Sequence, residues 1–250
     1  MSGHSKWAQI KRQKGVTDVR RGQLFTKLGR EITVAVREGG PNPESNFRLR
    51  LTMQKAHDKN MPSENIERAI KRGSGELGTA GLSEVIIEGY GPHGIAVLVE
   101  ALTDNRNRTL QEVRSLFYRH GGSLGASGSV SWIFDTRGII TVETDGVNAE
   151  ELELAAIDAG ADDVKEEKGY VEIHTTPQNL ETVRKAVEQI KPPVSAEVQR
   201  VAKQTVVLDE QQAIQTLKLL DHLEELDDVQ HVSANLDYSE AVLEKLRAQA

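Results

Sequence analysis

Cationic and aromatic residues gather in the first fourteen positions of the chain. Gly3-His4-Ser5-Lys6-Trp7 sets a lysine and a tryptophan among small residues, and Lys11, Arg12 and Lys14 follow. Lys and Arg neutralise phosphates while tryptophan stacks on a base or sugar, so this spacing is typical of a segment that contacts nucleic acid. A solubilising chain end with its tryptophan tucked against the domain explains the same residues, because basic runs are common at termini. Both interpretations stay open on these residues alone.

A second polar motif reads Thr103-Asp104-Asn105-Arg106-Asn107-Arg108-Thr109, where an apolar strand is expected to meet a helix. Asp104 or Asn105 is a natural N-cap, and the helix N-terminus with Arg106 and Arg108 offers a possible anion contact. Capping alone accounts for most of the motif, so the anion contact is the second of two interpretations.

Other familiar site patterns do not fit. The loop Gly121–Gly128 has neither the Walker nor the Rossmann spacing and precedes an expected strand, which favours a hinge or flexible loop over a nucleotide loop. The seven histidines lack metal-ligand spacing, and no nucleophile-elbow serine occurs. The acidic run between Glu150 and Glu167 is more typical of a solvated face than of a carboxylate site. We therefore expect no enzyme activity, no metal and no cofactor, and no small-molecule substrate is evident.

Composition narrows the class of protein further. The 250 residues contain no cysteine, which excludes disulfides and thiolate metal sites and fits a reducing compartment. No apolar stretch is long enough for a signal peptide or membrane span, so we expect a cytoplasmic protein without a membrane partner. A basic, acid-poor start also resembles an organellar transit peptide, although glycines interrupt its helical pattern.

The net charge of −7 hides an asymmetry along the chain. Residues 1–75 hold 16 Lys and Arg against 7 Asp and Glu, a net charge of +9, and the remaining residues hold 15 against 31, a net charge of −16. Such a separation indicates that the first part faces polyanions while the rest faces solvent or proteins.

Helical periodicity dominates the first third. Between Thr17 and Arg37, apolar residues recur on one side of a helix and Arg20, Lys27 and Arg30 fall on the other. Further helices are expected over 44–59 and from Pro62 to about residue 73, before a Gly/Ser/Thr-rich linker at 74–81.

Beyond the linker the pattern alternates between strands and helices. Strands are expected at 85–90, 95–102 and near 130–134, with a helix at 105–119 and a Gly/Ser-rich loop at 120–129. Residues 139–201 then follow a complete βαββαβ order, with strands at 139–142, near 164, 171–173 and 196–201, and helices at 149–159 and 178–190. Strands at 206–208 and 229–236 and helices at 211–226 and 239–248 complete the pattern.

The simplest topology is an α+β protein of three domains. The prediction is a basic helical domain (1–78) followed by two ferredoxin-like α/β domains, the third (137–203) inserted in the second (79–136 plus 204–250).

Motifs along the whole chain resemble those of the YebC/PmpR family, which includes the mitochondrial translational activator of cytochrome oxidase. They are Gly3-His4-Ser5-Lys6-Trp7, Arg21-Gly22, Phe25-Thr26-Lys27-Leu28, Asn60-Met61-Pro62, Asn65-Ile66-Glu67-Arg68, Glu88-Gly89-Tyr90-Gly91-Pro92 and Thr103–Thr109. One departure is Phe47, where many relatives carry proline, which leaves the start of the second helix open. The resemblance implies a three-domain crescent and a role without catalysis.

By position, the resemblance implies contact with nucleic acid through the N-terminal residues. These are His4, Ser5, Lys6, Trp7, Lys11, Lys14, Arg21 and Lys27. Arg12 of the basic run, with Arg20 and Arg30 of the basic helix face, completes the predicted set.

Two targets fit this set. Relatives are described as DNA-binding transcriptional regulators and as ribosome-associated translation factors that relieve stalls, for example at consecutive prolines. No helix-turn-helix with a readable recognition helix can be assigned, and an acidic body with a basic tip also suits a structured RNA cleft. A protein-binding adaptor is the third hypothesis. The target genes, sequence specificity, oligomeric state and any ligand between the domains do not follow from the sequence.

Overall fold

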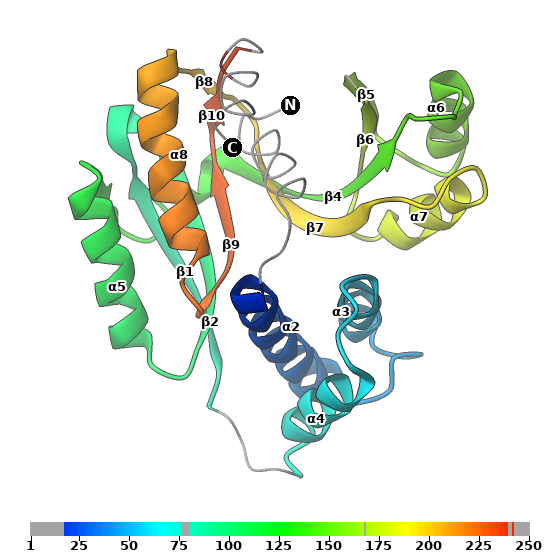
Figure 1. The fold of residues 1–250 in the computed structure, drawn as a ribbon, viewed down its shortest axis with the longest axis horizontal. Coiled ribbons are helices and arrows are strands. Elements are labelled where there is room, and N and C mark those ends of the chain that lie inside the picture. Colours follow the sequence, from blue (N-terminus) through cyan, green and yellow to red (C-terminus); the bar gives the residue numbers. More distant parts are fainter. Residues whose placement is uncertain (1–17, 77–80, 168, 240–241, 243–250) are drawn as a thin grey trace. The chain divides into compact units, whose positions relative to one another are not determined.

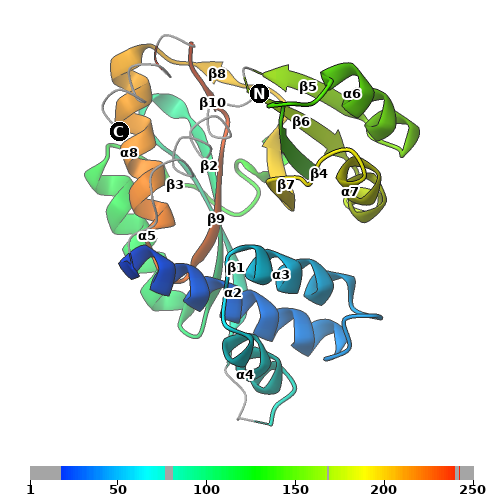
Figure 2. The ribbon, with the colours of Figure 1, turned by 45° about the vertical axis from the view of Figure 1, so that its right-hand side comes forward.

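The computed structural model describes residues 18–76, 81–167, 169–239 and 242. The chain divides into two compact units. One is formed by residues 134–203, and the other by the segments on either side of it. The element order, drawn in Figures 1 and 2, confirms an α+β fold in which a helical region precedes antiparallel sheets.

The helical domain of the larger unit contains three described helices, which are α2 (Asp18–Gly39), α3 (Phe47–Asp58) and α4 (Ser63–Gly73). Both short helices pack on α2, whose Leu28 and Ile32 are fully buried against Leu49 and Ile66. The apolar stripe expected on the first helix is therefore its core face, and burying it is the main stabilising term.

Two local features fix how these helices join. Asn46 caps α3: its side chain accepts from the Leu49 N–H at 3.0 Å and donates to the Ala35 carbonyl of α2 at 2.7 Å. Because Asn46 is the cap, α3 begins at Phe47, three residues after the expected start at 44. Gly73 approaches α2 so closely that a Cβ would lie 2.6 Å from the Thr33 carbonyl oxygen.

The sheet of the larger unit is antiparallel, in the order β3-β1-β2-β9. Its strands are β1 (Ser83–Tyr90), β2 (Ala96–Thr103), β3 (Ser123–Leu124) and β9 (Val229–Ala234). The 3₁₀ turn η1 (Pro92–Gly94) joins the first two. Helices α5 (Arg106–Arg119) and α8 (Glu210–Glu224) bury one face of the sheet, with Phe117 and Leu217 at the centre of the core. A parallel pair, β8 (Val206–Val207) and β10 (Leu236–Asp237), lies beside it.

The unit of residues 134–203 has the expected βαββαβ order. Its elements are β4 (Phe134–Glu143), α6 (Ala149–Asp158), β5 (Asp163–Glu167), β6 (Tyr170–Thr175), α7 (Leu180–Glu188) and β7 (Ser195–Ala202). The strand order β5-β6-β4-β7 is antiparallel throughout, as in a ferredoxin-like sheet. Ile140, Ile173, Leu152 and Val183 are fully buried in this unit.

Two local predictions were wrong. The strand expected near 130–134 is a 3₁₀ turn, η2 (Ser131–Ile133), and the next strand starts at Phe134 rather than at 139. The loop expected at 120–129 contains the short strand β3. The cause is Glu88, whose carboxylate accepts the N–H groups of Gly128, Val130 and Ser131 and so withdraws them from strand pairing.

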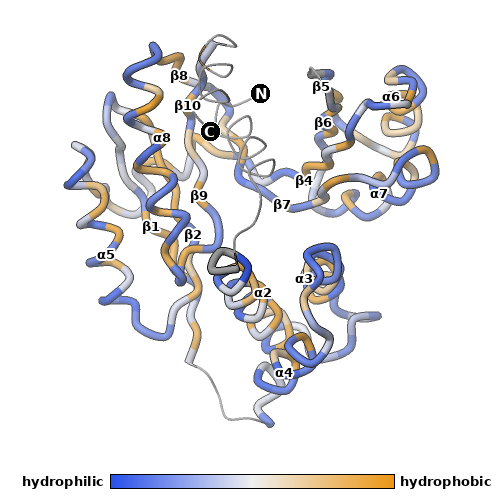
Figure 3. The backbone as a smooth tube through the Cα atoms, in the orientation of Figure 1, coloured by the Kyte–Doolittle hydropathy of each residue, from blue (hydrophilic) through white to orange (hydrophobic). Residues whose placement is uncertain are grey.

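Hydropathy varies along each described helix in Figure 3, as expected for helices with one buried face. Within the described residues, no helix is long and apolar enough to cross a membrane. Most of the last expected helix, 239–248, lies outside the described residues, so this element and the exact domain boundaries stay predictions.

Candidate nucleic-acid interface

The predicted contact set falls into two groups. His4, Ser5, Lys6, Trp7, Lys11, Arg12 and Lys14 lie outside the described residues, as does the side chain of Arg20. Arg21, Lys27 and Arg30 are described, and all three belong to α2. Arg21 is exposed, whereas Lys27 and Arg30 are half-buried.

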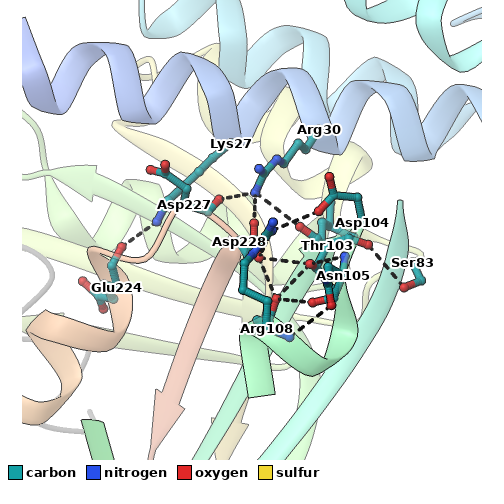
Figure 4. A network of polar contacts seen from close by, with 12 residues as sticks. Lys27, Arg30, Ser83, Thr103, Asp104, Asn105, Arg108, Glu224, Asp227 and Asp228 are labelled. Carbon is teal, nitrogen blue, oxygen red and sulfur yellow. Dashed lines mark hydrogen bonds and ion pairs between the residues drawn. The ribbon is translucent and has the colours of Figure 1, made fainter. Parts of the chain in front are cut away.

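Asp228, in the turn between α8 and β9, is the centre of the polar network in Figure 4. Its Oδ1 accepts from Arg30 Nη1 at 2.6 Å. Its Oδ2 accepts from Arg108 Nη2 at 2.8 Å and from the hydroxyls of Thr109 and Thr103 at 2.6 and 3.0 Å. One buried carboxylate thus joins α2 of the helical domain to β2 and α5 of the sheet domain.

The cations of α2 make further contacts with the same turn. Arg30 Nη1 also donates to the Asp227 carbonyl at 2.6 Å, and Lys27 Nζ donates to the Glu224 carbonyl at 2.5 Å. Both residues were predicted to contact nucleic acid. In the structure their charged groups hold the helical domain on the sheet domain, so contact with phosphates stays a prediction for them.

The motif Thr103–Thr109 is assembled around the same carboxylate. Asn105 caps α5 by accepting from the Arg108 N–H at 3.1 Å, and Thr103 Oγ1 accepts from the Asn105 N–H at 2.9 Å. The Arg108 guanidinium is shared between Asp228 and Asp104. The anion beside Arg108 is therefore a carboxylate of the chain itself. Arg106 is exposed, and its side chain has no hydrogen bond or ion pair among the described residues.

The network holds Asp228 in its charged form. Burial alone raises the pKa of this carboxyl, but the hydrogen bonds from Arg108, Thr109, Thr103 and Arg30 outweigh it and lower the pKa to about 2. Charge-assisted hydrogen bonds of this kind are about twice as strong as neutral ones, so the joint between the domains is electrostatic as well as apolar.

A second carboxylate on α2 makes a parallel contact. Glu31 Oε1 lies 3.4 Å from His231 Nε2 of β9, and its Oε2 lies 3.9 Å from Lys55 Nζ of α3. Burial raises the pKa of Glu31, yet Lys55 and His231 lower it to about 2. Glu31 and Asp228 together fix the orientation of α2 at two points.

Several other cations in the described part of the helical domain also have partners inside the chain. Arg37 donates to the Leu82 carbonyl, Arg48 pairs with Glu38 and Glu84, and Arg50 donates to the Pro43 carbonyl. A different group is exposed, and its side chains have no ion pair or hydrogen bond among the described residues; it consists of Lys59, Arg68, Lys71 and Arg72. None of these residues belongs to the predicted contact set, although Lys71 and Arg72 form a basic end of α4 that could have been found from the sequence.

Comparison with known proteins bears on the whole chain. The model of the TACO1/YebC protein N-terminal domain matches residues 5–76, and that of the TACO1/YebC second and third domain matches residues 82–236. The chain belongs to the TACO1/YebC family.

Relatives and a solved structure agree with this assignment. A probable transcriptional regulatory protein of Dehalococcoides mccartyi is 58% identical over the full length of both chains. Another of Chloroflexus aurantiacus is 51% identical and covers 99% of this chain and 100% of its own. The crystal structure of a conserved hypothetical protein from Aquifex aeolicus has a TM-score of 0.82 at 50% identity and covers 89% of this chain and 92% of its own. These TACO1/YebC relatives support a regulatory role for the family.

Proposed function

We propose that the chain regulates gene expression by binding nucleic acid through its helical domain, as a DNA-binding transcriptional regulator without catalytic activity. The observation that carries this proposal is the charge separation, with a net charge of +9 in residues 1–75 and −16 in the rest. The phosphate backbone supplies most of the affinity of such proteins, and cations supply the complementary charge. The relatives are named probable transcriptional regulatory proteins, which favours a role in transcription.

The geometry of α2 supports the same proposal. The basic residues of positions 6–14 precede Asp18, the first residue of α2. Asp228 and Glu31 fix α2 on the sheet domain through Arg30 and His231. The orientation of α2, the helix that follows the basic residues in the chain, is therefore fixed.

A ribosome-associated translation factor is the second candidate. The acidic body favours it, because the net charge of −16 in residues 76–250 would be repelled by DNA on either side of a contact. A structured RNA cleft that receives only the basic domain avoids part of this repulsion.

Fluorescence anisotropy with a 30-base-pair labelled duplex tests the proposal. If roughly six phosphates are neutralised, a plot of log affinity against log salt has a slope of about −5. Reversing the charge of Lys6, Lys11 and Lys14 to glutamate should make that slope less negative by about 3.

A matched control reverses three exposed cations outside the helical domain. These are Arg114, Lys185 and Lys218, which gives the same change in net charge. The control should keep the wild-type slope. A wild-type slope near zero would refute specific electrostatic contact by the helical domain. An equal loss of affinity in the Lys6/Lys11/Lys14 variant and in the control variant would refute it as well.

A further inference from the structure

The outer side of α4 presents a group of cations that the fold does not use. Arg68, Lys71 and Arg72 are all exposed, and none of their side chains has an ion pair or hydrogen bond among the described residues. By contrast, Lys27, Arg30, Arg37, Arg48, Arg50 and Lys55 each reach a carbonyl or carboxylate of the chain. In the described part of the helical domain, the available positive charge is thus concentrated on α4.

Helix geometry places the three cations on one face. Positions i, i+3 and i+4 are neighbours on a helix surface, and Arg68 and Arg72 are about 6 Å apart along the axis. Ile66 and Ala69 lie on the opposite side of α4 and are buried in the core of the helical domain. The cationic face therefore points to solvent, and Gly73 holds its helix directly against α2.

We propose that Arg68, Lys71 and Arg72 form a second contact surface for the phosphate backbone of duplex DNA. The inference rests on the proposed function and adds a site to it, separate from residues 4–14 of the chain. A span of about 6 Å covers roughly two phosphate-to-phosphate intervals, and therefore three phosphates, at an axial spacing of 3.4 Å per strand. The helix Ser63–Gly73 carries no aromatic residue, so it lacks the stacking groups that single-strand binding uses.

A simpler reason for Lys71 and Arg72 is the helix dipole, which favours cations in the last turn. Glu64 and Glu67 in the first half of α4 follow the same preference. The two explanations predict different results, because dipole stabilisation changes the free energy of unfolding and leaves affinity for DNA unchanged. Phosphate contact changes the affinity and its salt dependence.

The test uses the full chain with Arg68, Lys71 and Arg72 changed to glutamine, measured by anisotropy on the same duplex. Loss of three phosphate contacts should make the log-log salt slope less negative by about 2.7 and weaken binding in 0.1 M salt by roughly 500-fold. The control changes Arg114, Lys185 and Lys218 to glutamine and should keep the wild-type slope. A charge-keeping variant, R68K/R72K, should also keep it.

Each remaining outcome has a definite meaning. If the wild type binds with a steep slope and the α4 variant binds equally well, the α4 surface is refuted and the proposed function stands. If the wild type shows no salt-dependent binding, the proposed function itself fails. If the α4 variant loses binding to an RNA hairpin but keeps binding to the duplex, the assignment to DNA is overturned. Circular dichroism of each variant verifies the fold.

Discussion

Replacing Asp228 with asparagine tests the joint between the helical domain and the sheet domain. The substitution keeps the size of the side chain and removes its charge. Oδ1 and Oδ2 together accept four hydrogen bonds, from Arg30, Arg108, Thr103 and Thr109. An amide cannot accept all four, because one of its two polar atoms is a donor.

The expected cost follows from the pKa of Asp228. Its change from 3.8 to about 2 corresponds to about 2.5 kcal/mol of preference for the charged form in the folded state. A buried charged partner left without any counter-charge would cost more, about 3–5 kcal/mol. Arg30 keeps the Asp227 carbonyl and Arg108 keeps Asp104, so we expect D228N to lower the free energy of unfolding by about 2–3 kcal/mol.

The pH dependence has a definite sign. A carboxyl with a lowered pKa in the folded state stabilises fully above its unfolded pKa of 3.8 and loses that contribution as the pH falls towards 2. The wild type should therefore lose about 2.5 kcal/mol from this group between about pH 5 and about pH 1. D228N should lack this share of the acid sensitivity.

Urea titration followed by tryptophan fluorescence measures the free energy of unfolding of the larger compact unit, which contains Asp228. Both tryptophans, Trp7 and Trp132, lie outside residues 134–203, so the signal reports the unit that contains Asp228. Asp227 is the matched control, because it is adjacent and exposed and its backbone carbonyl, rather than its side chain, accepts from Arg30. If D228N and D227N differ by less than about 0.5 kcal/mol, the reasoning is wrong.

Three further predictions concern other parts of the same unit. Glu88→Ala leaves three backbone N–H groups without their carboxylate acceptor. We expect the free energy of unfolding, measured by urea titration, to fall by about 3 kcal/mol and proteolysis at residues 121–131 to become faster. Unchanged proteolysis would contradict this. Gly73→Ala should lower the free energy of unfolding by about 2 kcal/mol, because the new methyl group clashes with α2. At an unhindered helix position the same substitution would raise the free energy of unfolding by up to about 1 kcal/mol, so a stabilised variant would refute the close approach. Burial and the charge of His222, whose Nδ1 lies 3.1 Å from His120 Nε2, lower the pKa of His120. The wild type should therefore lose stability as the pH falls below 6.5. The substitution His222→Gln should raise the pKa of His120 in an NMR titration, and an unchanged midpoint would contradict the coupling between the two histidines.

Periodic elements of the fold could be predicted from the sequence because their signal is local. The stripe containing Leu28 and Ile32 has the helical period, and burial of these residues makes α2. The order of elements in residues 134–203 followed equally well from alternating strands and amphipathic helices. Errors arose where a side chain competes with the backbone pattern. Glu88 converts an apparent strand start into a turn, and Asn46 delays the start of α3.

The joint at Asp228 could not be predicted, because its partners are distant in the chain. Arg30 is 198 residues away and Arg108 is 120 residues away. A cationic helix face looks the same in sequence whether it faces phosphates or a carboxylate of the same chain. Arg30 was therefore predicted to contact nucleic acid, while Arg68, with no partner among the described residues, was not selected.

Sedimentation of a cell lysate with separate nuclease treatments tests the central claim most directly. We predict that the protein cosediments with chromosomal DNA, is released by DNase and not by RNase, and that charge reversal at Lys6, Lys11 and Lys14 abolishes the association. Cosedimentation with ribosomes that resists DNase and is lost on RNase treatment would contradict the DNA-binding account and favour the translation factor.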